Sequence, residues 1–125
     1  MIKTCLVVDD SRTVRRLVRR ILEDLSFDVS EAENGKVGLE LCDQSMPDAI
    51  LLDWNMPLTD GLSFLKALRG RPEGQFPKVI FCTSESDLSH IAEALGHGAN
   101  EYIMKPFDAD IIKEKLFEVG LIETL

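Results

Sequence analysis

The sequence predicts an α/β protein, in which helices cover both faces of an open, five-stranded parallel sheet. The main observation is that short apolar runs alternate with amphipathic stretches along the whole chain of 125 residues. Right-handed helical crossovers join strands of this kind into a parallel sheet. Composition agrees, because 45% hydrophobic and 29% charged residues are typical of a folded domain. We expect one domain over residues 1–125, with no effector domain.

Four apolar runs, rich in β-branched or aromatic residues, predict strands that are buried on both faces. These runs are Cys5–Val8, Ala49–Leu52, Val79–Cys82 and Tyr102–Met104. A fifth segment, Phe27–Ala32, alternates apolar and polar residues, as expected of a less buried edge strand. With this strand at one edge, the flavodoxin-like order 2-1-3-4-5 follows.

Amphipathic segments between these runs predict five helices. The strongest helical spacing lies within Ser11–Ser26 and Leu88–Leu95, and a last helix begins after Asp108 and runs to about Val119. Two further helices run from about Asn34 to Gln44 and from Asp60 or Thr59 to Arg69. Gly38 falls inside one of them, at a predicted cost of up to ~1 kcal/mol relative to alanine.

Charge and composition exclude several classes of protein. Lys and Arg total 14 against 22 Asp and Glu, and the net charge of -8 argues against binding nucleic acid. No apolar run approaches the ~20 residues of a membrane span, and the N-terminus does not fit a signal peptide. The odd number of cysteines, without C-x-x-C spacing, predicts reduced core residues at Cys5, Cys42 and Cys82. We expect a cytoplasmic monomer.

Polar side chains collect where the predicted strands end. Asp9 and Asp10 follow the first strand, Asp53 follows the third, Thr83 the fourth and Lys105 the fifth. Because the carboxyl ends of parallel strands share one edge, these groups converge there. Clustered carboxylates repel one another unless a cation is present, and oxygen ligands without His or Cys favour Mg²⁺ or Mn²⁺.

The predicted metal site implies a phosphoryl ligand, because protein-bound Mg²⁺ usually borrows phosphate oxygens. Lys105 supplies a second positive charge, and Thr83 supplies a hydroxyl donor. A carboxylate beside the metal can attack phosphorus and form an aspartyl phosphate. Asp53, flanked by the other groups, is the best candidate nucleophile.

Four stretches together carry a resemblance that none would carry alone. They are Asp9-Asp10-Ser11, Asp53-Trp54-Asn55-Met56-Pro57-Leu58-Thr59-Asp60-Gly61, Thr83-Ser84-Glu85 and Tyr102-Ile103-Met104-Lys105-Pro106-Phe107. They resemble the response-regulator receiver domain of two-component phosphorelays, and most closely its single-domain chemotaxis regulators. The likeness runs from about residue 3 to residue 119.

The resemblance implies a Mg²⁺-dependent phosphoacceptor. Asp53 would accept a phosphoryl group from a histidine of a sensor kinase or phosphotransfer protein. Asp10, Asp53 and the backbone carbonyl of Asn55 would bind Mg²⁺, with Asp9 acting mainly through water. Lys105 would pair with the acyl phosphate.

The same resemblance implies how the signal leaves the site. Thr83 would move to bond the phosphoryl group, and Tyr102 would turn inward as an aromatic switch. The Lys105–Pro106 bond would be cis. An output protein such as the flagellar motor switch would bind the fourth helix, fifth strand and fifth helix. The remaining neighbours of the phosphate would be Trp54, Ser84, Glu85 and Pro106.

Several of these residues also have plain structural interpretations. Asp10-Ser11 fits a helix N-cap, Lys105-Pro106 fits a strand end, and residues 83–87 fit a helix start. Tyr102 fits an ordinary strand aromatic, and Trp54 a partly exposed aromatic beside the site. His90 and His97 share a helical face without a third ligand, which favours surface histidines over a metal site.

Five arginines form a stripe on the first helix. They fall within about 140° of the helical wheel, opposite its apolar face. One interpretation is a solvated face, and the other is a field that steers an acidic partner, here the phosphodonor. The stripe consists of Arg12, Arg15, Arg16, Arg19 and Arg20.

Two other classes of protein fit less well. A phosphohydrolase of the haloacid-dehalogenase type needs a second acid two residues after the nucleophile, where this chain has Asn55. A flavin carrier needs a Ser/Thr/Gly-rich phosphate loop after the first strand, where this chain has Asp9 and Asp10. Within the phosphorelay class, chemotaxis, a phosphate sink and cell-cycle or stress signalling would share the same site.

Overall fold

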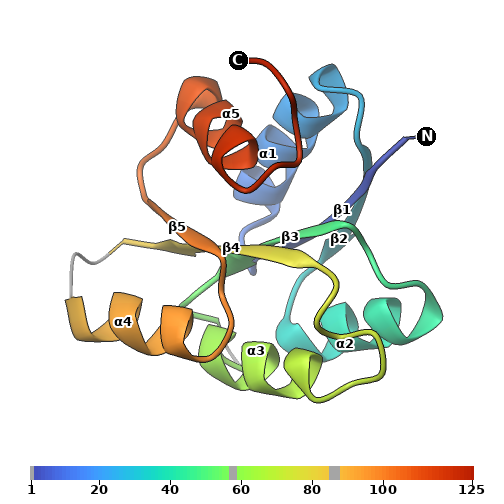
Figure 1. Cartoon of the computed structure of the whole chain (residues 1–125), viewed down its shortest axis with the longest axis vertical. Helices are drawn as coiled ribbons and strands as arrows, with labels where there is room; N and C mark the ends of the chain where they lie inside the picture. Colours follow the sequence, from blue (N-terminus) through green and yellow to red (C-terminus); the bar gives the residue numbers. More distant parts are fainter. Residues whose placement is uncertain (1, 57–58, 85–87) are drawn as a thin grey trace.

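Five parallel strands form a single sheet in the order β2-β1-β3-β4-β5, as predicted. The computed structural model describes residues 2–56, 59–84 and 88–125. Figure 1 shows α1 and α5 on one face of the sheet, and α2, α3 and α4 on the other. The strands are β1 (Thr4–Val8), β2 (Asp28–Ala32), β3 (Ala49–Asp53), β4 (Lys78–Thr83) and β5 (Glu101–Met104). The helices are α1 (Arg12–Asp24), α2 (Gly35–Gln44), α3 (Gly61–Arg69), α4 (Leu88–Gly96) and α5 (Ala109–Glu118).

Burial along the strands follows the hydrophobic pattern of the sequence. Every residue of β3 is buried, because helices cover both faces at the centre of the sheet. In β2, buried Val29 and Ala32 alternate with exposed Asp28 and Ser30, which confirms that β2 is the less buried edge strand. Cys5, Cys42 and Cys82 are all buried and free, in agreement with their prediction as core residues.

Polar side chains cap the helices and set where they begin. The Asp60 and Asp108 carboxylates accept the backbone N–H of Ser63 at 2.8 Å and of Ile111 at 3.0 Å. Asp60, rather than Thr59, is therefore the cap of α3. Ser11 Oγ likewise accepts the Val14 N–H at 3.2 Å, so the capping interpretation of Asp10-Ser11 holds for Ser11.

The sheet separates two hydrophobic clusters. One lies between the sheet and α2, α3 and α4, and Phe64 and Phe81 are fully buried in it. The other lies under α1 and α5, and includes Leu22, Leu51 and Leu116. Because each cluster contains side chains of the same central strands, the two helical layers fix the sheet between them.

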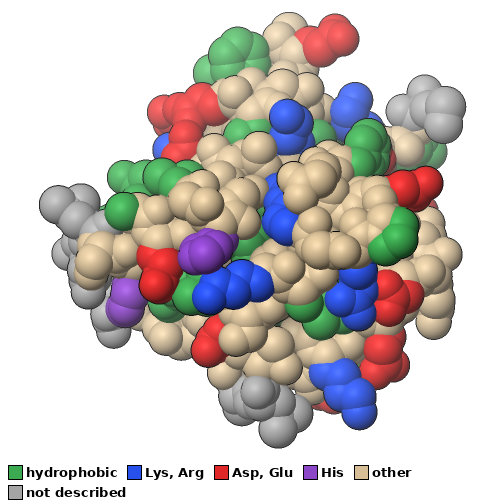
Figure 2. All heavy atoms as spheres, turned by 60° about the horizontal axis from the view of Figure 1, so that its bottom comes forward, with side chains coloured by type: hydrophobic (Ala, Val, Ile, Leu, Met, Phe, Trp, Pro, Cys, Tyr) green, Lys and Arg blue, Asp and Glu red, His purple; other side chains and the backbone are tan. Residues whose placement is uncertain are grey.

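Charged side chains are distributed without one dominant sign over α2, α3 and α4. Figure 2 looks onto this side of the molecule, where basic and acidic side chains are interspersed. Such a face offers no basic footprint for a nucleic acid backbone. In the part of the chain that the structure describes, no helix is both long enough and apolar enough to cross a membrane.

Gly38 corrects an expectation drawn from helix propensity. A Cβ at this position would lie 2.9 Å from the Phe64 ring and 3.2 Å from a Val8 methyl group. Phe64 and Val8 are both fully buried in the same hydrophobic cluster, so neither side chain can move away without disturbing the core. Glycine is therefore required by the close approach of α2 to α3 and β1, and alanine would not stabilise this helix.

We expect Gly38→Ala to destabilise the protein by about 1–3 kcal/mol, because overpacking a dense core costs more than helix propensity returns. The free energy of unfolding in urea measures this effect. Gly96→Ala is the matched control, since a Cβ there meets nothing within 4 Å and Gly96 also lies in a helix. The control should be neutral or slightly stabilising. A stabilised Gly38→Ala protein would contradict the packing argument.

Candidate functional site

The predicted convergence of polar groups at the carboxyl edge of the sheet is confirmed. Asp9 and Asp10 follow β1, Asp53 ends β3, Thr83 ends β4 and Lys105 follows β5. Lys105 Nζ lies 3.1 Å from Asp9 Oδ2 and 3.1 Å from Asp53 Oδ1. Groups separated by up to 96 positions in the sequence therefore share one small site.

The acidic cluster consists of Asp9, Asp10 and Asp53. One carboxylate oxygen from each residue lies within 4.8 Å of the others. Asp9 and Asp53 are only 3% and 6% exposed, whereas Asp10 is open to solvent. Such a set of oxygen donors, partly buried and partly accessible, can hold a hard divalent cation.

Charge in this cluster is unbalanced, because three carboxylates face one ammonium group. Burial, followed by the repulsion of Asp9, raises the pKa of Asp53 from 3.8 to about 6, although Lys105 opposes the shift. Burial by itself lowers the pKa of Lys105, but the attraction of Asp53 and Asp9 outweighs it and the pKa is raised. Lys105 therefore stays protonated, and the acidic cluster retains excess negative charge for a cation to neutralise.

Asp9 is held by four hydrogen bonds, two at its main chain and two at its carboxylate. Its N–H donates to the Ala32 carbonyl at 3.1 Å, and its carbonyl accepts from Arg15 Nη1 at 2.8 Å. Its Oδ1 accepts the Ser11 N–H at 2.8 Å, while Oδ2 accepts from Lys105. This carboxylate is therefore fixed before any ligand arrives.

The arginine stripe is divided, which the helical wheel did not predict. Arg15 and Arg19 both donate to Glu31 of β2, so neither is part of a freely solvated face. Only Arg12, Arg16 and Arg20 are exposed. No pattern in the sequence places Arg15 and Glu31 beside the site, because their contact joins a helix to an edge strand 16 positions away.

Other predicted site residues lie where β3, β4 and β5 end. Thr83 is 1% exposed, and its carbonyl accepts the Lys105 N–H at 2.8 Å. The Lys105–Pro106 bond is cis, as the resemblance implied. Asn55, Ser84 and Pro106 are exposed at the rim. The predicted neighbour Glu85, and with it the helix start at 85–87, lies outside the described residues, as do residues 57–58 of the quoted motif.

Trp54 and His90 correct two expectations of surface exposure. Trp54 is 7% exposed, and its ring lies 5.4 Å from the Phe81 ring and 5.6 Å from the His90 ring. Trp54 is thus a core residue directly after Asp53, and His90 is a half-buried residue packed on it. His97 is exposed, as predicted.

Tyr102 lies on β5 beside Phe81 of β4, and their ring centroids are 6.0 Å apart. Tyr102 is half-buried, and Nζ of Lys115, on α5, lies 5.3 Å from the centre of its ring. Tyr102 therefore connects β5, the strand that Lys105 follows, to α5.

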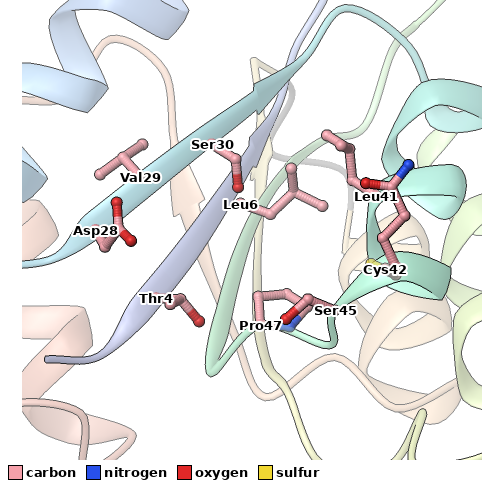
Figure 3. A pocket seen from close by; sticks show the side chains of 10 residues that line it. Thr4, Leu6, Asp28, Val29, Ser30, Leu41, Cys42, Ser45 and Pro47 are labelled. Atoms are coloured by element: carbon pink, nitrogen blue, oxygen red, sulfur yellow. The ribbon is translucent and has the colours of Figure 1, made fainter. Parts of the chain in front are cut away.

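Two hollows lie at opposite ends of the sheet, and only one of the two is lined by a residue of the site. A groove of about 410 Å³ opens beside Lys105, and is lined by Val14, Leu17, Ser84, Lys105, Pro106 and Phe107. A hollow of about 290 Å³ lies between β2 and α2, toward the amino ends of the strands (Figure 3). Thr4 and Asp28, which begin β1 and β2, line this second hollow, so it belongs to the opposite end of the sheet.

Comparison with known proteins decides the family. A family model described as the response regulator receiver domain matches residues 5–117. The chain belongs to the response regulator receiver family. This receiver is 39% identical over 115 residues to chemotaxis protein CheY-3 of Vibrio cholerae, which covers 91% of this chain and 88% of that protein. It is 40% identical over 113 residues to CheY1 of Helicobacter pylori, which covers 89% of this chain and 91% of that protein.

Solved structures agree with the sequence comparison. Vibrio cholerae CheY4, crystallised at low pH, matches with a TM-score of 0.91 at 29% identity, over 95% of this chain and 99% of that chain. A response regulator from Chloroflexus aurantiacus matches with a TM-score of 0.89 at 27% identity, over 95% and 98%. The protein is thus a CheY-like receiver of two-component signalling.

The raised pKa of Asp53 predicts a pH-dependent cost of keeping the site ionised. Below about pH 4 this carboxyl is protonated in both folded and unfolded chains, whereas above about pH 6 it is ionised in both. The free energy of unfolding therefore falls as the pH rises from about 4 to about 6. We expect Asp53→Asn, which keeps an acceptor for Lys105, to stabilise the metal-free receiver by about 2–3 kcal/mol at pH 8 and by little at pH 4.

Urea unfolding in EDTA at the two pH values measures this difference. Asp24→Asn is the control, because Asp24 is exposed at the end of α1. A gain of equal size at both pH values would show that the ionised Asp53 carboxylate is not its source.

Proposed function

We propose that this receiver accepts a phosphoryl group on Asp53 from a histidine of a sensor kinase or phosphotransfer protein, in a Mg²⁺-dependent reaction in the cytoplasm. The phosphorylated form then binds an output protein, such as the flagellar motor switch in chemotaxis. The observation that carries this proposal is the meeting of Asp53, the other two acids and Lys105 at one sheet edge. The chemotaxis assignment is supported by relatives named as chemotaxis proteins.

Asp53 is suited to attack phosphorus. Its carboxylate oxygen forms the new bond to phosphorus while the bond between phosphorus and the donor histidine nitrogen breaks, and that nitrogen keeps the electron pair. The Lys105 ammonium, 3.1 Å from Asp53 Oδ1, neutralises charge on the transferred phosphoryl oxygens. Water would later attack the acyl phosphate, breaking the bond between phosphorus and the Asp53 oxygen and releasing inorganic phosphate. The chain would thus assist both its own phosphorylation and its own dephosphorylation.

The acidic cluster fits Mg²⁺, with Mn²⁺ as an alternative, because its side-chain donors are all oxygen atoms. Asp10, Asp53 and the backbone carbonyl of Asn55 would hold the ion, with Asp9 acting mainly through water. When bound, the ion supplies positive charge for the carboxylates and the phosphoryl oxygens. The excess negative charge of the cluster supports this assignment.

The groove beside Lys105 supports docking of the phosphodonor near α1. Val14 and Leu17 give it an apolar wall, and Leu17 is 51% exposed. Exposed Arg12, Arg16 and Arg20 lie on the same helix, where they would speed encounter with an acidic partner. Arg15 and Arg19 are excluded from this steering role by their contacts with Glu31.

Output would proceed through Thr83 and Tyr102. A phosphoryl group on Asp53 offers oxygens to the Thr83 hydroxyl, since both residues end adjacent strands. Movement of Thr83 would give Tyr102 room to change rotamer and alter the surface of α4, β5 and α5. Exposed Leu95 and Met104 give this surface apolar contacts for a partner.

Phosphorylation by acetyl phosphate tests the chemistry directly. With Mg²⁺, the receiver should gain one phosphoryl group, and Asp53→Asn should gain none, because the nucleophile is absent. Asp10→Asn should need more Mg²⁺ to reach the same level. Intact mass spectrometry measures the modification, with Asp24→Asn as the control. Equal labelling of Asp53→Asn and the unchanged receiver would overturn the acceptor assignment.

Thr83→Ala should separate phosphorylation from output. The variant should still be labelled on Asp53, but should lose most of the phosphorylation-dependent gain in affinity for the motor switch protein. Thr83→Ser keeps the hydroxyl and is the matched control. Labelling and affinity are measured on the same sample. A full affinity gain in phosphorylated Thr83→Ala would show that coupling does not pass through this hydroxyl.

A further inference from the structure

Arg15 contacts the acidic cluster from outside, through the main chain rather than through a carboxylate. Its Nη1 donates to the Asp9 carbonyl at 2.8 Å, reaching back from the first turns of α1 to the loop after β1. The Arg15 side chain is only 13% exposed, against 37% for Arg19, and such burial is unusual for an arginine. The low exposure of Arg15 and its bond to the Asp9 carbonyl indicate a role in the structure of the site, and not only in solubility.

Glu31 holds the other side of the same guanidinium group. Arg15 Nε donates to Glu31 Oε1 at 3.1 Å, and the second Glu31 oxygen accepts from Arg19 Nη1. Arg19 is itself anchored by its Nη2, which donates to the Val29 carbonyl at 2.7 Å. Arg15 is thus fixed between the edge strand β2 and the Asp9 main chain.

We infer that Arg15 is a positioning residue, which fixes the main chain at Asp9 so that the Asp9 and Asp10 carboxylates face Asp53. This inference rests on the proposed function, because the arrangement it protects is the Mg²⁺ site. Asp9 links Arg15 to the acidic cluster, because its carbonyl accepts a hydrogen bond from Arg15 while its carboxylate accepts hydrogen bonds from Ser11 and Lys105. A main chain free to shift at Asp9 would displace the neighbouring Asp10 as well.

A positioning role of Arg15 and a simple charge effect of Arg15 predict opposite changes in Mg²⁺ affinity when the side chain is removed. A positive charge near the acidic cluster repels Mg²⁺, so its removal should strengthen binding if charge alone matters. If Arg15 positions Asp9, its removal should weaken binding instead. Lysine cannot replace the planar fork, because a single ammonium group does not match the fixed geometry that joins Glu31 to the Asp9 carbonyl.

Mg²⁺ titration of matched variants tests the inference, by calorimetry and by Trp54 fluorescence. Arg15→Met and Arg15→Lys should each raise the Mg²⁺ dissociation constant by at least about tenfold, the lower end of the effect seen when groups that orient metal ligands are removed. Arg19→Met is the matched control, because it also removes a positive charge and a bond to Glu31 but has no bond to Asp9. Its dissociation constant should stay within about twofold of the unchanged receiver.

Each other outcome overturns the inference. Tighter binding by Arg15→Met would mean that charge dominates, and unchanged binding by Arg15→Lys would mean that the fork is not needed. An equal loss in Arg19→Met would mean that both arginines merely attach α1 to β2. If Arg15→Met does not fold, Arg15→Lys decides. Failure of the unchanged receiver to bind Mg²⁺ would instead overturn the proposed function, and the inference with it.

Discussion

Repulsion between three carboxylates within 4.8 Å of one another is the constraint on which the rest of this structure depends. One ammonium group, from Lys105, offsets only part of that charge, and burial together with the repulsion of Asp9 still raises the pKa of Asp53. A site of this kind costs stability when it is empty of cations, so the surrounding fold must hold it in place. The same excess negative charge attracts a hard divalent cation, which together with Lys105 would offset the negative charge of a transferred phosphoryl group in the proposed function.

The fold holds the acidic cluster in place by burying β1 and β3, the strands that carry Asp9 and Asp53 at their carboxyl ends. Val8 and Leu52, which precede the acids of β1 and β3, are fully buried, and the two hydrophobic clusters press on these strands from both faces. Buried strand ends position Asp9 and Asp53, whereas Thr83 and Tyr102, the side chains that we propose respond to phosphorylation, lie on β4 and β5. In this proposal, support of the acidic cluster and output of the signal involve different strands of one sheet.

The arginines of α1 show how a single sequence feature can serve two purposes. Arg15 and Arg19 turn toward β2 and are bound by Glu31, whereas Arg12, Arg16 and Arg20 remain exposed. Burial raises the pKa of Glu31, but hydrogen bonds from Arg19 and Arg15 outweigh it and lower that pKa, so the acceptor stays ionised. Arg15 bonds the Asp9 main chain, Arg19 joins α1 to β2, and the other three arginines are exposed to solvent.

Local patterns in the sequence determined the five strands and helices, their order, the cap at Asp108, and the meeting of Asp9, Asp53 and Lys105 at one edge. These features follow from periodicity along one segment and from the shared edge of parallel strands. Only the tertiary structure decided the burial of Trp54, the need for glycine at position 38, and the bonds of Arg15 to Glu31 and the Asp9 carbonyl. Each of these depends on side chains from separate segments reaching the same space, which no pattern within one segment records.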